Sequence, residues 1–355
     1  MIDAILLAAA VTFPTLTQIR TGAPPLPANP TTTNFTFVVA GDNRPADPND
    51  KQTTAFKDIL DRVAATPPAF VVWNGDTIYG KDASVAGGQY KKFRAEFGKH
   101  KVNVPLFDAP GNHELALAGS LPCGKKDKPI DQPDPSGKLL GQYTQHMGPP
   151  YGMFRYGNAA FLAVNTDDTL DVTAPDPCAY NGFVGKAQLD ALQATLAQLS
   201  ADPSVTHIFL FMHRPLHDTD PSGKPNSHQF GPHPPSQSPD YDARLLAFIA
   251  ALDLPAQGNY PYPKITFVFS SHDHRLFVWP IPSSPNGPFS RTSPSTAGPT
   301  FVTTGGGGAP LAGCKHHGTG DPGAWYHSVS VTVDGSSVKV TVNPLNGTTN
   351  CGAAP

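Results

Sequence analysis

Five apolar segments of this chain each lead into Asp, Asn or His. The segments 35–40, 69–73, 104–107, 206–212 and 264–269 are followed by Asp42, Asp76, Asn112, His213 and the pair His272 and His274. Near-continuous apolar runs of this kind are typical of strands buried on both faces. In α/β sheets, ligands sit beyond the carboxyl ends of the strands, so these polar side chains are expected at one rim. The pattern predicts an α/β fold with a functional site at that rim.

Helical periodicity separates several of these segments. Apolar residues at helical spacing predict helices over 51–65, 84–97, 186–199 and 242–252. Further strands are expected at 159–164 and 301–304, and the C-terminal segments 327–333 and 338–342 form a predicted hairpin. The segments rich in Gly, Pro, Ser or His are predicted to be loops, namely 115–150, 217–240 and 280–300.

The residues at the strand ends form a recognisable set of metal ligands. Two carboxylates, one amide oxygen and three imidazoles suit Zn, Fe or Mn rather than Ca. They are too many for one tetrahedral ion and about enough for two ions that share a carboxylate. Two such ions clamp the attacking and leaving oxygens of a phosphoryl displacement, and their shared water becomes the nucleophile. His113, next to Asn112, is placed to assist the leaving group.

The motifs resemble those of the calcineurin-like metallophosphoesterase superfamily, in family order between about residues 37 and 274. They are Gly41-Asp42, Gly75-Asp76, Gly111-Asn112-His113-Glu114, His213 after a strand, and His272-Asp273-His274. The resemblance implies two facing mixed β-sheets flanked by helices, with a dimetal site at the carboxyl ends of the strands.

The same resemblance implies a role for each of these residues. Asp76 would bridge the two ions and take part in catalysis. His113 would act on the leaving group, oriented by a carboxylate such as Glu114 or Asp76. The residues expected to hold one ion are Asn112, His213 and His272, and those expected to hold the other are Asp42 and His274.

Two residues depart from the common family pattern or add to it. Arg44 stands where many members have a metal-binding His, and a guanidinium cannot ligate. Residues 75–79, Gly-Asp-Thr-Ile-Tyr, match the GDxxY motif of purple acid phosphatases, in which the tyrosine ligates a ferric ion. Tyr79 is therefore expected to complete the first metal site, and an ordinary half-buried tyrosine is the alternative.

Two residues are candidates for substrate binding. Arg44 is expected to hold a substrate phosphate through a forked pair of hydrogen bonds, and a salt bridge to a nearby carboxylate such as Asp47 is the alternative. His217, in the loop after the His213 strand, is a candidate for the mouth of the site. Gly305 to Gly308 would bring N–H groups near a phosphate, or form a sharp turn that lets the sheet edge pack.

The resemblance to purple acid phosphatases predicts a hydrolase of small phosphate monoesters. Its metal-bridging hydroxide would attack phosphorus, and its cofactors would be iron paired with zinc, manganese or a second iron. A phosphodiesterase acting on nucleotides or lipid headgroups is an alternative, because the metal ligands are shared. A more distant alternative is a non-catalytic phosphate-binding protein with a degenerate site, since Arg44 departs from the pattern.

The composition of the chain indicates which binding partners and which cellular compartment to expect. A net charge of −3 gives no basic face for a nucleic-acid polymer, and no segment approaches the length of a membrane span. Four cysteines in a chain rich in proline favour two disulfides and an oxidising compartment. Three pairings are possible, and chain order favours Cys123 with Cys178 and Cys314 with Cys351.

The N-terminal segment has the apolar middle of a signal peptide but lacks its basic start. We therefore expect an exported protein, periplasmic or secreted. The predicted organisation is a signal-like segment with a Pro-rich arm over 1–30, a single metallophosphoesterase domain over 31–345, and a disulfide-tied tail over 346–355. The sequence carries no signal for an oligomeric state.

Overall fold

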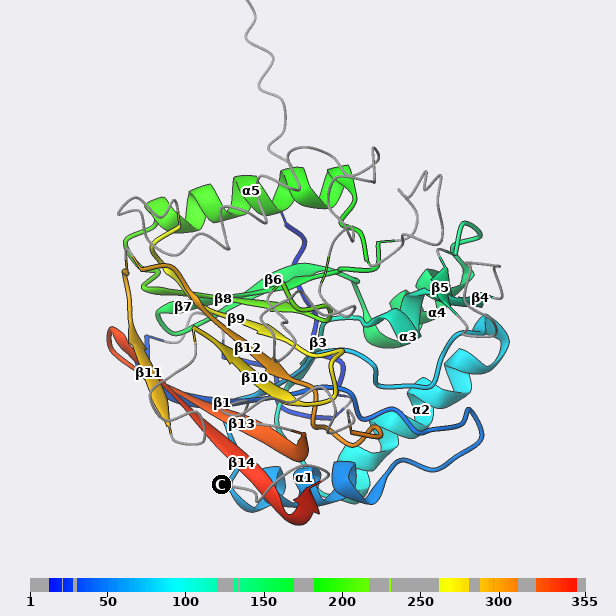
Figure 1. Ribbon diagram of the computed structural model, residues 1–355. Helices are drawn as coiled ribbons and strands as arrows, with labels where there is room; N and C mark the ends of the chain where they lie inside the picture. The colour runs from blue at the N-terminus through cyan, green and yellow to red at the C-terminus, as the bar shows by residue number, and fades with distance from the viewer. Residues whose placement is uncertain are drawn as a thin grey trace, which may run out of the picture.

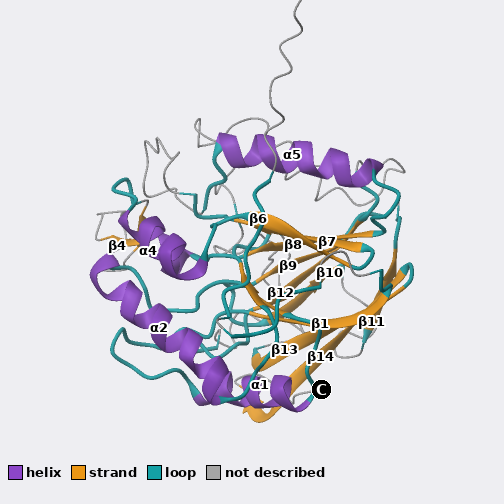
Figure 2. Ribbon diagram, turned by 180° about the vertical axis from the view of Figure 1, so that it is seen from behind, coloured by secondary structure: helices purple, strands orange, loops and turns teal. Residues whose placement is uncertain are grey.

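Two six-stranded mixed sheets face each other, and helices cover their outer faces (Figures 1 and 2). This architecture confirms the predicted two-sheet α/β sandwich. The computed structural model describes residues 13–20, 22–27, 31–119, 130–132, 134–168, 182–216, 230, 262–280, 288–295, 297–311 and 324–349.

The first sheet carries three parallel strands at one side and antiparallel strands at the other. β1 runs parallel to β2, and β2 runs parallel to β3, while β1 is antiparallel to β13. The carboxyl ends of β1, β2 and β3 therefore lie at the same rim. In spatial order the strands are β11 (Phe289–Thr292), β14 (Ser337–Thr349), β13 (Trp325–Asp334), β1 (Asn34–Ala40), β2 (Val71–Trp73) and β3 (Leu106–Asp108).

The second sheet has a parallel centre and antiparallel outer strands. The four central strands, β7, β8, β9 and β12, run parallel to one another, whereas β10 is antiparallel to β12 and β6 is antiparallel to β7. In spatial order the strands are β10 (Leu276–Trp279), β12 (Thr300–Thr304), β9 (Ile265–Ser270), β8 (His207–Met212), β7 (Ala159–Val164) and β6 (Gly152–Tyr156).

Phenylalanine side chains fill the space between the two sheets. The ring of Phe37 on β1 lies 5.2 Å from that of Phe161 on β7 and 5.1 Å from that of Phe209 on β8, both edge to face. Phe161 and Phe209 are stacked at 5.2 Å. Such aromatic pairs add about 0.5–1.5 kcal/mol beyond their buried area, so they fix how one sheet lies on the other. The rim that carries the site is therefore held by a rigid core.

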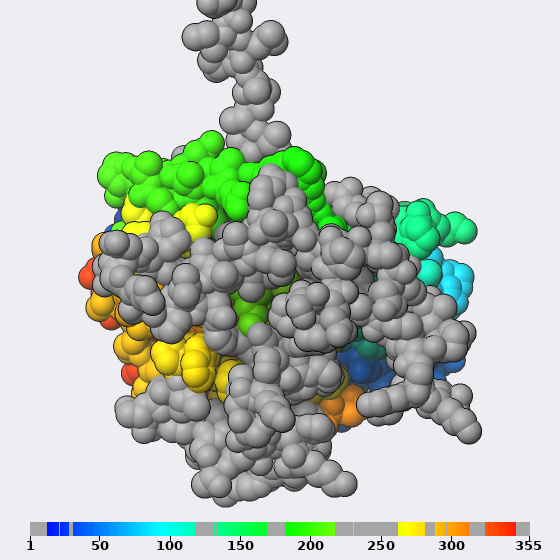
Figure 3. Space-filling view, turned by 45° about the horizontal axis from the view of Figure 1, so that its top comes forward, coloured from blue at the N-terminus to red at the C-terminus, as the bar shows by residue number. Residues whose placement is uncertain are grey.

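The outer layers are helical. α5 (Lys186–Ala201) buries Leu189, Leu192 and Leu196 against the second sheet, and its atoms form the green ridge at the top of Figure 3. The other long helices pack on the first sheet or beside it, and a one-turn helix and a two-stranded hairpin lie near the site rim. These elements are α1 (Thr54–Ala65), α2 (Ala83–Lys99), α4 (Lys138–Met147), α3 (Asn112–Leu115), β4 (Leu117–Gly119) and β5 (Ile130–Gln132).

The helices predicted over 51–65, 84–97 and 186–199 are confirmed, but two predicted loops contain regular structure. Segment 115–150 holds β4, β5 and α4, because Leu139, Tyr143 and Met147 recur at four-residue spacing and bury one helix face. Segment 280–300 holds β11, which pairs with β14. The predicted helix 242–252 lies outside the described residues.

Residues 13–20 of the predicted arm lie along both sheets. Leu16 N donates to the carbonyl of Met153 on β6 at 2.8 Å, and Ile19 N donates to that of Leu106 on β3 at 2.8 Å. Leu16 and Ile19 are both buried. This short segment therefore joins the outermost strand of one sheet to the outermost strand of the other.

Several predictions fall outside the described residues, including all four cysteines, the segment 1–12 and His217. Among the helices that the structure describes, none combines the length and apolar character needed to cross a membrane.

Candidate metal centre

The predicted ligands lie together at the rim where the two sheets meet. Asp42 follows β1, Asp76 follows β2, and Asn112 opens α3 after β3, while the histidines follow β8 and β9 of the other sheet. Asp42, Asp76 and His272 have φ values of 60°, 51° and 68°, which cost of order 1–3 kcal/mol each in residues other than glycine. Strained backbone at three adjoining polar positions is typical of a functional site.

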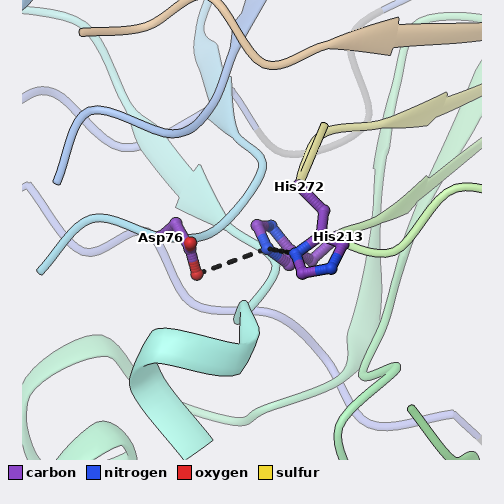
Figure 4. A group of neighbouring side chains, drawn as sticks. All are labelled: Asp76, His213 and His272. Atoms are coloured by element: carbon purple, nitrogen blue, oxygen red, sulfur yellow. Dashed lines mark hydrogen bonds and ion pairs between the residues drawn. The ribbon is translucent and has the colours of Figure 1, made fainter. Parts of the chain in front are cut away.

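Asp76 stands at the centre of this cluster. Its Oδ1 lies 3.3 Å from Nε2 of His213, and its Oδ2 lies 3.9 Å from Nε2 of His113. Figure 4 shows the Asp76 carboxylate facing His213, with His272 beside it. Asp76, His213 and His272 offer ligand atoms within 4.8 Å of one another, and so do Asp42, Asp76 and His274. Asp76 therefore belongs to both groups.

The surroundings of the Asp42 carboxylate are suited to a bound cation. Its side chain is buried, and Oδ1 has no hydrogen-bond partner among the described residues. That oxygen lies 3.5 Å from Nε2 of His274 and 4.0 Å from Nε2 of His213. A buried carboxylate oxygen without a donor is costly, and an ion shared with these imidazoles would satisfy it. The donor set of carboxylates and imidazoles fits Zn, Fe or Mn.

Backbone carbonyls fix the tautomers of three histidines. Nδ1 of His213 lies 2.9 Å from the carbonyl oxygen of Asn74, and Nδ1 of His274 lies 2.5 Å from that of Pro310. Nδ1 of His113 contacts the carbonyl oxygen of Tyr79. A carbonyl only accepts, so each Nδ1 carries the proton and each Nε2 presents a lone pair to the site.

Burial and charge set the protonation of the central residues. Burial alone would raise the pKa of Asp76, but His213, His113 and Arg44 outweigh it and hold that pKa well below its usual range. Burial lowers the pKa of His113 well below the usual value for histidine. Asp76 is therefore a carboxylate throughout the neutral range, as a metal ligand must be.

Glu114 organises the loop that carries Asp76. Its carboxylate accepts hydrogen bonds from the backbone N–H groups of Asp76, Thr77, Ile78 and Gly111 at 2.7–3.2 Å. Burial and the Asp76 charge raise the pKa of Glu114 to about 7. Of the two carboxylates expected to orient His113, Asp76 contacts it, since the His113 N–H donates to Asp76 Oδ1 at 3.0 Å. Glu114 does not orient His113, because its carboxylate is bonded to the loop while the Tyr79 carbonyl holds the His113 ring.

Arg44 lies beside Asp76. Its Nε is 3.4 Å from Oδ2 of Asp76, so the alternative of a salt bridge to a nearby Asp is met by Asp76. Among the described residues no ion pair joins Arg44 to Asp47. A cavity of about 160 Å³ opens here. Its walls are Arg44, Asp76, Asn112, His113, His272, Asp273 and His274.

Tyr79 lies next to His113. It is half-buried, and its ring stands edge-on to the imidazole at 5.8 Å between centroids. Coordination by its hydroxyl stays a prediction, and so does the role of His217, which lies outside the described residues.

The glycine run packs against the loop that carries Asp42. The N–H of Gly307 donates to the carbonyl of Gly41 at 2.8 Å, and that of Ala309 donates to the carbonyl of Asp42 at 2.7 Å. A Cβ on Gly305 would lie 2.8 Å from Oδ2 of Asp42. These N–H groups are bonded to backbone, so the run acts as a packing turn beside the site.

Sequence reasoning missed four residues that support the ligands, namely Asn74, Asp131, Asp167 and Arg214. Asn74 and Arg214 adjoin predicted motifs, and Asp167 follows the strand at 159–164. Their places in the sequence could therefore have marked them as candidates. Asp131 lies in a segment predicted to be a loop and carries no such signal.

Two adjoining groups of potential metal ligands therefore lie at the rim of a two-sheet sandwich. The chain belongs to the calcineurin-like phosphoesterase family, whose model matches residues 35–276.

Solved structures show the same fold. Purple acid phosphatase PPD1 from yellow lupin (Lupinus luteus) is 18% identical at a TM-score of 0.57, over 90% of this chain and 53% of that chain. PhoD is 14% identical at a TM-score of 0.52, over 88% of this chain and 66% of that chain. This chain thus spans about half of the lupin enzyme's length. The comparison with curated proteins finds no match.

Proposed function

We propose that this protein hydrolyses small phosphate monoesters with two transition metal ions. The observation that carries the proposal is the position of Asp76, which belongs to both groups of potential ligands. A carboxylate common to two such groups is suited to bridge two ions. The similarity of the fold to a purple acid phosphatase supports the monoester class.

The proposed ligands divide around Asp76. His213 and His272, with the amide oxygen of Asn112, would hold one ion. Asp42 and His274 would hold the other, with the Tyr79 hydroxyl as a further ligand if that ion is ferric iron. Iron paired with zinc, manganese or a second iron fits this set. Bound ions supply Lewis acidity toward the phosphoryl oxygens and a water of lowered pKa as the attacking group.

His113 is the proposed catalytic residue for the leaving group. The Tyr79 carbonyl holds its Nδ1, so Nε2 is the atom that faces the cavity beside Asp76. Burial favours the neutral ring, so Nε2 would have to take up a proton, which the Asp76 charge favours, before donating it to the leaving oxygen as the ester bond breaks.

Arg44 is the proposed phosphate-binding residue. Its Nε stays close to Asp76, and the guanidinium lines the cavity. Its remaining N–H groups offer paired hydrogen bonds to the free oxygens of a phosphoryl group. A monoester, which has more free oxygens and more negative charge than a diester, gains more from this contact.

We also propose that the enzyme works outside the cytoplasm. The apolar N-terminal segment and the even number of cysteines support this location. Intact mass before and after reduction, on protein recovered from the cell envelope and the medium, tests for the two disulfides.

A substrate panel tests the proposed function. The chelated protein is reconstituted with iron plus zinc, with manganese or with iron alone, and is assayed on an aryl phosphate monoester and the matching diester. We expect about two ions per chain and a higher kcat/KM for the monoester. A preference for the diester would overturn the substrate class. Fewer than two bound ions, with no turnover of either ester, would support the non-catalytic alternative.

A further inference from the structure

Asp131, on β5, contacts a proposed metal ligand without belonging to either ligand group. Its Oδ2 accepts a hydrogen bond from Nδ2 of Asn112 at 2.7 Å and another from Nη2 of Arg214 at 2.9 Å. Its Oδ1 forms an ion pair with Lys81. One carboxylate on a small hairpin thus meets three donors from three other segments of the chain.

The contact with Asn112 decides which end of the amide faces the site. An ionised carboxylate only accepts, so the atom of Asn112 that meets Asp131 is the NH₂ group. The amide oxygen is then turned the other way, 2.9 Å from Nε2 of His213. A flipped amide would present hydrogens to the metal and an oxygen to a carboxylate, and both contacts would be repulsive.

Asp131 is itself held in place by buried charges. Arg214 is buried, and its guanidinium also binds Asp167, with Nε 3.0 Å from each carboxylate oxygen. Lys81 donates to the Asn112 carbonyl at 3.3 Å as well as meeting Asp131. Lys81 and Arg214 each form an ion pair with the Asp131 carboxylate. The carboxylate is therefore fixed in both position and charge.

We infer that Asp131 is a positioning residue for the metal centre, which orients the Asn112 amide so that its oxygen faces the ion bound by His213 and His272. The inference rests on the proposed function, because it requires a metal at that group. Outer partners of metal ligands set ligand orientation, and their loss typically costs 10–100-fold in metal affinity.

Metal affinity in Asp131→Ala tests this inference directly. Binding of zinc or manganese is measured by chelator competition, which resolves the two sites without any assay of turnover. We expect one site to weaken by about 10- to 100-fold and the other to stay within about threefold. Asp190→Ala is the matched control, because it removes a carboxylate that pairs with Lys186 on α5, and both sites should keep their affinity.

An exchanged pair tests whether the direct contact between residues 112 and 131 matters to the metal site, apart from general support of the hairpin. Asn112→Asp alone places two carboxylates in contact and should weaken the same site. The double variant Asn112→Asp/Asp131→Asn restores one donor and one acceptor with their direction reversed, and should bind metal at least about tenfold more tightly than Asn112→Asp. A double variant no better than Asn112→Asp would overturn the inference.

The outcomes distinguish this inference from the proposed function. A wild-type protein that binds no transition metal would overturn the proposed function. A wild-type protein that binds two ions, with an Asp131→Ala variant that binds both equally well, leaves the proposed function standing and overturns only the role of Asp131. Thermal unfolding of the chelated variants shows that each compared protein is folded.

Discussion

Asn74 and His213 bind each other across the two sheets. The carbonyl oxygen of Asn74, after β2, accepts from Nδ1 of His213, after β8, at 2.9 Å. The Asn74 amide also donates to the carbonyl of Met212 at 3.0 Å. One residue of the first sheet thus fixes both the backbone and the ring of a proposed ligand in the second.

Replacing Asn74 by Ala should weaken both the fold and the site. The buried Met212 carbonyl would lose its donor, at a cost of about 1–3 kcal/mol, so the backbone just before His213 would be held less firmly. The main-chain carbonyl of residue 74 would still accept from the His213 ring. Denaturant unfolding and metal content measure the two effects. Asn158→Ala is the matched control, because its amide donates to the Gly335 carbonyl at 2.7 Å elsewhere. It should lose stability but keep its metal, and equal metal content in both variants would contradict the expectation.

Replacing Glu114 by Gln should disorder the loop that carries Asp76. A glutamine NH₂ group would face N–H groups that now meet a carboxylate, so several buried donors would lose their acceptor. We expect a loss of at least about 2 kcal/mol in the free energy of unfolding. Thr77→Val removes only the hydroxyl donor to Glu114 and should cost about 1 kcal/mol. Similar losses in the two variants would argue against Glu114 as the organiser of this loop.

Replacing His113 by Ala should lower turnover without removing metal. Loss of a general acid typically costs 10²–10⁴-fold in kcat, and His113 is not among the proposed ligands. Asp76→Asn should instead lower the content of both ions, because it weakens a ligand common to both groups. Steady-state kinetics and elemental analysis on the same preparations separate the two cases. Near-normal turnover in either variant would show that the assigned roles are incorrect.

Replacing Tyr79 by Phe should abolish a visible absorption band if the tyrosine binds ferric iron. Charge transfer from a phenolate to ferric iron would colour the aerobically purified protein, and phenylalanine has no oxygen to supply it. The edge-on contact between Tyr79 and His113 is available to either ring, so the fold should be retained. Wild-type protein that contains iron but shows no such band would remove Tyr79 from the ligand set.

His327 should make the protein less stable in mild acid. Burial lowers its pKa to about 4, and Nδ1 lies 2.8 Å from the carbonyl oxygen of Trp325. The unfolded chain has the higher histidine pKa, so it binds the proton first, and stability is lost as the pH falls from about 6.5 to about 4. The loss approaches about 3 kcal/mol, at 1.36 kcal/mol per pKa unit.

A comparison of unfolding curves isolates this contribution. His327→Gln removes the titrating group, so its free energy of unfolding should fall less between pH 7 and pH 4.5 than that of the wild type. Parallel curves would contradict the assignment to His327.

The ligands could be predicted from the sequence because the signal for each is local. Asp42, Asp76 and His213 each follow an apolar strand, and parallel strands bring their carboxyl ends to one rim. The apolar runs that contain Phe37 and Phe161 could likewise be predicted as strands. Pairing of those strands into two sheets followed from the family resemblance rather than from the residues alone.

The supporting residues could not be predicted, because their partners are distant in the chain. Asp131 meets Asn112 and Arg214 only after β4 and β5 form their hairpin, and that segment has no strong strand pattern. Either Glu114 or Asp76 was expected to orient His113, but the turn of α3 directs the Glu114 carboxylate to the loop at 75–78, and Asp76 is the one that contacts His113. Hydrogen-bond partners of buried charges depend on the folded backbone, which local patterns do not specify.

The segment over residues 13–20 has a consequence for any shortened form of this protein. It pairs with β3 and with β6, the outermost strands of the two sheets. A chain cut after Arg20 would leave both strands with open hydrogen-bonding edges, and such edges invite pairing between molecules. A cut before Phe13 would keep them covered. Aggregation, rather than a loss of chemistry, is therefore what removal of this segment would cause first.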